Sequence, residues 1–278
     1  MARVPLSFEF FPPKTEEQHA ALEAALPRLK ALQPDYVSCT FGAGGSTLRY
    51  TPDTIRRLRE VHGLDAAPHL SCMGGTRAEI ASLLADYRAM GCRRIVALRG
   101  DLPSGMASHG DFRYASELVS FIRGEQDGHF HIEVACYPEV HPQADDAHRD
   151  LDHFQAKVAA GADGAITQYF YNADGYFRFV EAVRRRGIDI PITPGIMPIA
   201  NFTQLKRFSE LCGAEIPRWL GKRLHALGDD AASIRDFAAT VVAELCDRLV
   251  VGGAPGLHFY TLNRSKPTLA VLERMQRR

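Results

Sequence analysis

The sequence predicts an α/β fold, a (β/α)8 TIM barrel with an extra helical segment before its eighth strand. Short apolar, β-prone runs alternate with stretches whose apolar residues recur at helical spacing. Most steps from one run to the next take roughly 28 to 37 residues, the size of one βαβ unit. The chain has 278 residues, and about 250 are typical of such a barrel. We therefore expect one catalytic barrel domain over residues 1–278.

The expected strands are short runs that stop at glycine, proline or a charged residue. Ile95–Leu98 has no polar alternation, which is typical of a strand buried on both faces. The other expected strands cover residues 7–11, 36–41, 69–73, 132–137, 164–170, 190–197 and 256–262. A doubly wound open sheet is the alternative, but the Gly-x-Gly-x-x-Gly fingerprint of that class is missing after the first strand.

Helices are expected between these strands. Thr15 and Thr76 are candidate N-caps, and Glu79 completes a capping box with Thr76. Another helix is expected through Ile55, Leu58 and Val61 on one face. The remaining helices are expected near residues 115–123, 145–160 and 177–186, over 203–249 with breaks at 213–217 and 228–230, and from Ser265 onward.

Composition narrows the class of partner. With 33 basic and 33 acidic residues, the balanced charge argues against nucleic acid or an anionic membrane surface. The six cysteines form no Cys-x-x-Cys pair, which is typical of buried thiols in a reducing compartment, and no cluster has metal-ligand spacing. We find no signal peptide and no apolar run of about 18 residues, so we expect a cytoplasmic protein without a membrane span.

Glu9 is the first candidate catalytic residue. It lies in an aromatic strand, where alternation points it away from Phe8 and Phe10 and into the barrel. A carboxyl group in apolar surroundings holds its proton more tightly, which suits a general acid. A barrel-core ion pair with Arg99 or Lys157 is the alternative.

Polar side chains follow other strands, at the face where parallel barrels build their active sites. Arg99, Gly100 and Asp101 follow the fourth strand, and the glycine lets the backbone approach a ligand closely. Tyr137 and His141 follow the fifth strand, where a ring could stack and an imidazole could donate to phosphate or ribose. The plainer alternatives are a solvated turn with Asp101 as helix cap, and a turn stiffened by proline.

Asp150, His153 and Lys157 fall on one helix face, which could fold over a cofactor or simply face solvent. Thr40 precedes a glycine-rich segment whose N–H groups could hold a phosphate or a ring carbonyl. That segment could equally be a flexible loop. His69 begins the third strand, where a structural histidine is the more common reading.

Gln168 lies at the end of the sixth strand, and Arg264 follows the eighth strand. The buried amide of Gln168 could pair with the edge of a heterocycle, or it could bond to the backbone. Arg264 could bind a carboxylate or a phosphate, or it could form a surface salt bridge. The sequence has no serine, histidine and aspartate in the chain order of a serine hydrolase, no His-Glu-x-x-His motif and no EF-hand calcium loop. Together these side chains suit a large planar cofactor better than hydrolysis.

A series of short motifs spans nearly the whole chain. They are Phe8-Glu-Phe-Phe-Pro-Pro13, Thr40-Phe-Gly-Ala-Gly-Gly-Ser-Thr47, Leu98-Arg-Gly-Asp101, Tyr137-Pro-Glu-Val-His-Pro142, Thr167-Gln168, Pro194-Gly-Ile-Met-Pro198 and His258-Phe-Tyr-Thr-Leu-Asn-Arg264. In this order and spacing they resemble the methylenetetrahydrofolate reductase family, in its bacterial, FAD-dependent type that comprises the catalytic barrel alone.

The resemblance implies a barrel with non-covalently bound FAD, and a homo-oligomer. NADH or NADPH would reduce the flavin and leave, and 5,10-methylenetetrahydrofolate would then be reduced to 5-methyltetrahydrofolate. That product donates methyl groups for methionine synthesis. Because the chain ends soon after the eighth strand, inhibition by S-adenosylmethionine is not expected.

The resemblance also implies residue roles. Glu9 would be the general acid, and Asp101 would be the second catalytic residue, near both flavin and pterin. FAD would be held by Thr40, His69, Arg99, Gly100, Asp101, Ala115, Tyr137, His141, Asp150, His153 and Lys157. Folate would be held by Asp101, Gln168, Gln204, Phe208 and Arg264, with Phe208 stacking on folate or nicotinamide. His153 departs from the family, which often has asparagine there.

Two other functions stay open on the sequence. A related barrel could reduce the same folate by direct hydride transfer without flavin, or an inactive barrel could bind folate or flavin as a sensor. The presence of Glu9, Asp101 and Gln168 argues against the inactive barrel. No pattern in the sequence decides between NADH and NADPH.

Overall fold

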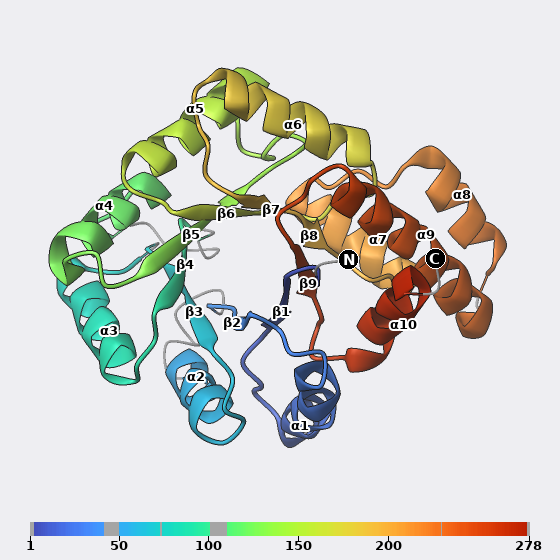
Figure 1. Ribbon diagram of the computed structural model, residues 1–278, viewed down its shortest axis with the longest axis horizontal. Helices are drawn as coiled ribbons and strands as arrows, with labels where there is room; N and C mark the ends of the chain where they lie inside the picture. Colours follow the sequence, from blue (N-terminus) through green and yellow to red (C-terminus); the bar gives the residue numbers. More distant parts are fainter. Residues whose placement is uncertain (1–2, 42–49, 73, 101–109, 229, 277–278) are drawn as a thin grey trace.

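Parallel strands form a ring at the centre of the molecule, and helices lie around it (Figure 1). The computed structural model describes residues 3–41, 50–72, 74–100, 110–228 and 230–276. The chain therefore folds as the predicted α/β barrel.

The strands are short, as the sequence predicts. Their bounds are β1 Leu6–Phe10, β2 Tyr36–Cys39, β3 Ala66–Ser71, β4 Arg94–Leu98, β5 His131–Cys136, β6 Gly164–Thr167, β7 Ile192–Thr193, β8 Gly195–Ile196 and β9 Leu257–Tyr260. They follow one another in the order β7-β6-β5-β4-β3-β2-β1-β9-β8, with parallel pairing throughout. Strands far apart in the sequence, such as β1 and β9, are thus direct neighbours.

The barrel closes at a broken strand. The stretch expected as one seventh strand forms two pieces, β7 paired with β6 and β8 paired with β9. Pro194 separates them, because proline has no N–H for the ladder. Two side-chain bonds bridge the gap: Gly195 N donates to Thr167 Oγ1 over 2.9 Å, and the Tyr260 hydroxyl donates to Thr167 O over 2.7 Å.

The helices lie where the sequence predicts them. Their bounds are α1 Glu16–Lys30, α2 Tyr50–Glu60, α3 Arg77–Ala89, α4 Ala115–Gln126, α5 Ala147–Ala159, α6 Ala173–Arg185, α7 Phe202–Cys212, α8 Arg218–Ala226, α9 Ala231–Val251 and α10 Ser265–Gln276. Thr15 caps α1, and Thr76 forms the expected capping box with Glu79. The predicted extra helical segment is present as α7 and α8, ahead of the long α9.

One helix was predicted to run one residue too far. Val61 lies past the end of α2 and is 63% exposed. The helix stops at Glu60, and Gly63 then turns the chain with a φ of 61°. Ile55 and Leu58 are buried as expected.

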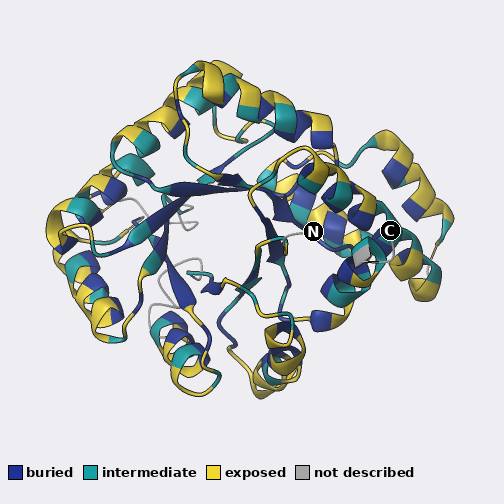
Figure 2. Ribbon diagram, viewed as in Figure 1, coloured by how far each residue is buried: buried dark blue, intermediate teal, exposed yellow. Residues whose placement is uncertain are grey.

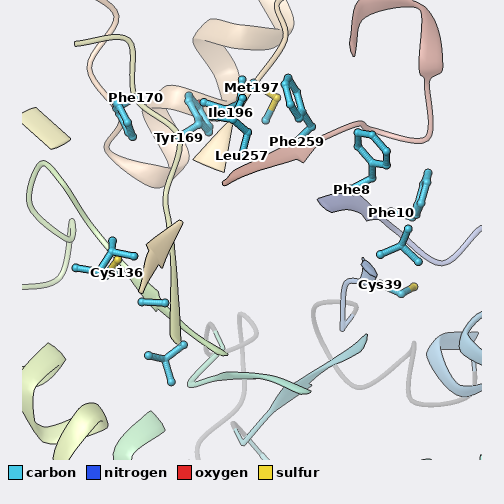
Figure 3. Packing of buried hydrophobic residues seen from close by; sticks show 14 of the residues in the cluster. Phe8, Phe10, Cys39, Cys136, Tyr169, Phe170, Ile196, Met197, Leu257 and Phe259 are labelled. Carbon is cyan, nitrogen blue, oxygen red and sulfur yellow. The ribbon is translucent and has the colours of Figure 1, made fainter. Parts of the chain in front are cut away.

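The core lies along the strands and the inward faces of the helices (Figure 2). Phe8 and Phe10 of β1 belong to this cluster, together with Leu22 and Leu26 of α1, and Figure 3 shows Phe8 beside Phe259 of β9. Burying one such aromatic side chain contributes roughly 1.5–3 kcal/mol. Because successive strand residues point to opposite faces, the burial of these phenylalanines turns Glu9 toward the barrel interior.

Candidate active site

Glu9 lies inside the barrel beside two buried histidines. Its Oε2 atom is 3.3 Å from Nε2 of His69 on β3 and 3.5 Å from Nε2 of His258 on β9. The carboxyl side chain is 17% exposed, whereas the His69 and His258 side chains are 7% and 0% exposed. The ion-pair partners considered from the sequence, Arg99 and Lys157, are therefore wrong, and imidazoles take their place.

The His69 ring is held in its neutral form. Burial lowers its pKa, because desolvation disfavours the imidazolium, and the attraction of Glu9 opposes this only in part. Among the described residues, the Nε2 atoms of His69 and His258 have no hydrogen-bond partner of good geometry. Both atoms therefore face the Glu9 carboxyl group as potential proton donors or acceptors.

The end of β1 is fixed by the turn that follows β9. Thr261 Oγ1 donates to the carbonyl of Glu9 over 2.6 Å. The Asn263 side chain accepts from Phe11 N over 3.0 Å and donates to Phe11 O over 2.9 Å. Asn263 adopts a left-handed φ of 56°, which asparagine tolerates better than most residues. The motif that ends at Arg264 thus positions the strand that carries Glu9, while the Arg264 side chain itself is exposed.

A cavity open to solvent adjoins the ends of β4 and β5 and the helices α4 and α5. Its lining includes most of the residues expected to hold FAD, namely Arg99, Ala115, Tyr137, His141, Asp150, His153 and Lys157. Tyr114, Ser116, Gln143 and Ala144 complete the lining. The structure thus gathers side chains from separate parts of the chain at the strand ends, as a parallel barrel should.

The cavity carries cationic groups next to aromatic rings. Lys157 Nζ donates to Ala135 O over 2.5 Å, and burial lowers the pKa of this partly buried ammonium. Arg99 donates to the Gln143 side chain. The Tyr114 ring stacks on His153 with 5.5 Å between the ring centroids. This combination suits a ligand with an anionic diphosphate and a planar ring.

The loop that carries His141 is held by the facing helix. Asp150 Oδ2 accepts from His141 N over 3.0 Å, and His141 Nδ1 accepts from Gln143 N over 3.0 Å. A neutral His141 ring in this arrangement carries its proton on Nε2. The expected helix face of Asp150, His153 and Lys157 therefore does cover the cavity.

Other expected site residues lie apart from this cavity. Gln168 Oε1 accepts from Tyr169 N over 3.0 Å, and Gln168 lines a smaller cavity that also includes Tyr137. Gln204 and Phe208 lie on α7, which contacts the segment after β6 through a 3.0 Å hydrogen bond between the Tyr169 and Ser209 side chains. In the described part of the chain, neither Gln204, Phe208 nor Arg264 lines the larger cavity.

Thr40 and Gly100 stand at the edges of undescribed segments. The Thr40 carbonyl accepts from Thr51 Oγ1 over 3.0 Å. Gly100 has a φ of 84°, a left-handed conformation that favours glycine. Asp101 and the glycine-rich segment 42–46 lie outside the described residues.

Sequence reasoning assigned no role to His258 or Tyr114. Alternation along the eighth strand would have turned His258 and Tyr260 to the same face, which is a usable signal. Tyr114 directly precedes α4 and gave no comparable pattern. The described residues contain no group of three or more His, Cys, Asp or Glu side chains arranged to hold a metal ion, and none of the described helices has the length and apolarity to span a membrane.

An interior acid flanked by imidazoles and a cavity at the strand ends define a barrel enzyme. The family model for methylenetetrahydrofolate reductase matches residues 2–276. The 5,10-methylenetetrahydrofolate reductase of Escherichia coli (strain K12) is 41% identical over 269 residues, which cover 97% of this chain and 90% of that one. Methylenetetrahydrofolate reductase (NADH) 1 of Arabidopsis thaliana is 36% identical over 96% of this chain and 47% of its own length. The chain therefore belongs to the methylenetetrahydrofolate reductase family of oxidoreductases.

A solved structure shares the fold. An uncharacterized protein from Clostridium thermocellum that binds two copies of 5-methyl-5,6,7,8-tetrahydrofolic acid superposes with a TM-score of 0.67, at 16% sequence identity. The match covers 99% of this chain and 94% of that one. This likeness supports the barrel architecture.

Proposed function

We propose that the chain, as a single catalytic barrel domain, reduces 5,10-methylenetetrahydrofolate to 5-methyltetrahydrofolate. NADH or NADPH supplies the electrons through FAD in a ping-pong sequence, and the product feeds methionine synthesis. The observation that carries the proposal is the Glu9 carboxyl group held between His69 and His258 inside a family barrel. The names of the relatives and the folate bound by the structural neighbour support the same substrate class.

The cavity at α4 and α5 fits FAD by its chemistry. Arg99 and Lys157 supply positive charge for a diphosphate, and an ammonium has donors beyond the one that bonds to Ala135 O. His141 presents an N–H donor in its neutral form, and the Tyr137 ring offers an apolar face. When bound, FAD would accept a hydride from the nicotinamide and pass it to the folate. Thr40, His69, Gly100, Ala115, Asp150 and His153 complete the proposed cofactor contacts.

The proton comes from Glu9 in this proposal. Glu9 protonates the amine nitrogen that leaves the methylene bridge, which opens the bridge to an electrophilic iminium on the substrate. The neutral His69 ring and His258 hold the carboxyl group and can exchange its proton. Asp101 is proposed to lie between flavin and pterin. Gln168 is proposed to pair with the pterin, and Gln204, Phe208 and Arg264 to hold the rest of the folate.

The test uses the absorbance spectrum of the purified protein, followed by anaerobic titration. We expect a yellow protein that releases FAD on denaturation, bleaches with NADH and regains colour with 5,10-methylenetetrahydrofolate. Colourless protein with full NADH-linked activity would show instead a direct hydride transfer without flavin. We also propose that the protein is cytoplasmic and forms a homo-oligomer; sedimentation of the purified protein tests the oligomeric state.

A further inference from the structure

The loop after β5 presents side chains to two different cavities. Tyr137 and His141 line the larger cavity beside α4 and α5, and their rings meet edge to face with 4.5 Å between the centroids. Glu139 lies between them in the sequence, yet it lines the smaller cavity together with Cys212 at the end of α7. Glu139 therefore stands between two proposed flavin contacts but faces another part of the barrel.

The Glu139 carboxyl group binds the backbone just after α7. Glu215 N donates to Glu139 Oε2 over 2.8 Å, across 76 positions of the chain. Glu139 is half-buried, and burial raises its pKa, while the hydrogen bond from Glu215 N opposes this rise. Because removing a carboxyl group from water costs free energy, such a position needs a donor that compensates. The bond to Glu215 N supplies that donor.

The same loop packs against the end of α7 at a second point. Gly213 ends the helix with a φ of 74°, which favours glycine. A Cβ atom at this position would lie 2.7 Å from Pro142 Cγ, a separation that packed carbon atoms do not reach. One turn earlier in α7, Ser209 Oγ lies 3.0 Å from the hydroxyl of Tyr169, which follows β6. The segments after β5 and β6 thus hold the C-terminal end of α7.

These contacts matter because α7 carries proposed folate contacts. Gln204, Phe208 and Cys212 are four residues apart, so they share one face of the helix. Cys212 lines the smaller cavity beside Glu139, which places this end of the face at the loop after β5. The α9 and α10 helices lie close together, whereas no described helix lies that close to α7. The position of the Gln204 and Phe208 face therefore depends on contacts such as that of Glu139.

We infer that Glu139 is a positioning residue that holds the end of α7 to the loop of Tyr137 and His141, so that a flavin bound against the loop also positions the folate-contacting face of α7. Glu139 acts through the loop and the helix and not by touching a ligand. The link between ligands rests on the proposed function, whereas the bond from Glu215 N is a property of the folded chain.

Hydrogen exchange of the FAD-free protein, read at single amides, tests the bond itself. Glu139→Ala removes the acceptor, so the Glu215 amide should exchange at least about tenfold faster than in the wild type. Glu139→Gln keeps a side-chain oxygen that can accept from Glu215 N, so the wild-type rate should return. Wild-type exchange in Glu139→Ala, or equally fast exchange in both variants, overturns the inference.

The link from the loop to the helix is tested by adding FAD. In the wild type, FAD should slow exchange in residues 137–144 and also in residues 209–215. In Glu139→Ala, FAD should slow exchange in the loop alone. If residues 209–215 gain no protection in the wild type, or keep it in Glu139→Ala, the inference is overturned while the proposed flavin site stands. If FAD protects neither segment of the wild type, the proposed flavin site fails and the link fails with it, and the FAD-free exchange still decides the bond.

The effect on the folate side is measured as the dissociation constant of 5-methyltetrahydrofolate on FAD-loaded protein. Glu139→Ala should raise this constant at least about fivefold, and Glu139→Gln should restore it. An unchanged constant in Glu139→Ala refutes the positioning role. If the wild type binds no 5-methyltetrahydrofolate, the proposed substrate is wrong and the folate part of the inference is refuted with it.

Asp111→Ala is the matched control. Asp111 Oδ2 also accepts a backbone N–H from a distant segment, that of Arg77 at the start of α3, over 2.9 Å. This variant should leave the exchange of residues 209–215 and the folate dissociation constant as in the wild type. Equal changes in Asp111→Ala and Glu139→Ala would mean that the loss of any such bond is sufficient, and would overturn the specific role of Glu139.

Discussion

The Nε2 atom of His69 on β3 lies 3.3 Å from a carboxylate oxygen of Glu9 on β1, although β2 separates the two strands in the barrel. One of these residues is the proposed acid and the other a proposed flavin contact. Because the two side chains are in contact, the protonation of Glu9 would change the electrostatic environment of a bound flavin. The protonation of the two groups must be measured together.

Replacing Glu9 by glutamine separates the two half-reactions. The amide keeps the size of the side chain but has no acidic proton, so folate reduction should fall about 100-fold or more. Bleaching of the flavin by NADH should continue. Stopped-flow absorbance measures both steps, and Glu16→Gln on the exposed start of α1 is the control. Survival of both half-reactions in Glu9→Gln would remove Glu9 from the role of acid.

Replacing Lys157 by methionine should weaken FAD binding by at least about tenfold, because a hydrogen bond to a charged group contributes roughly 1.5–3 kcal/mol. The protein without cofactor should stay as stable or become more stable, since a partly desolvated ammonium is replaced by an apolar chain. Fluorescence titration with FAD and thermal unfolding measure the two effects. Lys222→Met, on the exposed face of α8, should change neither. Equal FAD affinity in Lys157→Met and the wild type would exclude the contact.

The buried His69 ring should make stability depend on pH. Its pKa is lowered in the folded state, while an unfolded histidine titrates near pH 6.5. Between those two values the unfolded chain binds more protons, so the free energy of unfolding falls as the pH drops below about 6.5. His69→Gln should therefore lose less stability between about pH 7.5 and pH 5.5 in urea unfolding. His19→Gln, on the exposed face of α1, should keep the wild-type slope; a wild-type slope in His69→Gln would contradict the prediction.

Gly164 leaves room for a buried carboxylate. A Cβ atom at this position would meet the Glu133 side chain, which is tied to Arg94 and His131. Gly164→Ala should destabilise the fold by about 1–3 kcal/mol through overpacking. In α4, a Cβ on Gly124 would meet no atom within 4 Å, so Gly124→Ala should stabilise the helix by up to about 1 kcal/mol. Urea unfolding of both variants checks the contrast, and similar effects of the two changes would count against it.

Much of the fold could be predicted because its signals are local. Alternation in β1 turned Glu9 inward, and the caps at Thr15 and Thr76 marked helix starts. Val61 shows the limit, since the helical spacing continued by one residue beyond Glu60, where α2 ends. Apolar periodicity alone does not show at which residue a helix ends.

The partners of Glu9 could not be predicted in the same way. Ser7 and His258 are 251 positions apart, and they meet only because β1 and β9 are neighbours in a closed ring. Charge type suggested Arg99 or Lys157 as partners, but the structure turns these cations to the cavity beside α5. The grouping of the cavity residues was predictable as a set, because the strand ends of a parallel barrel share one face.

The break at Pro194 leaves β7 and β8 with only two residues each. Local unfolding begins where the fewest backbone hydrogen bonds must be broken, so the barrel should open first between β7 and β8. The backbone amides of Gly195 and Ile196 should then exchange with deuterium sooner than those of β4. Local opening between β7 and β8 would let water reach the barrel interior. This route lies beside Thr167 and Tyr260, away from the cavity that α4 and α5 line.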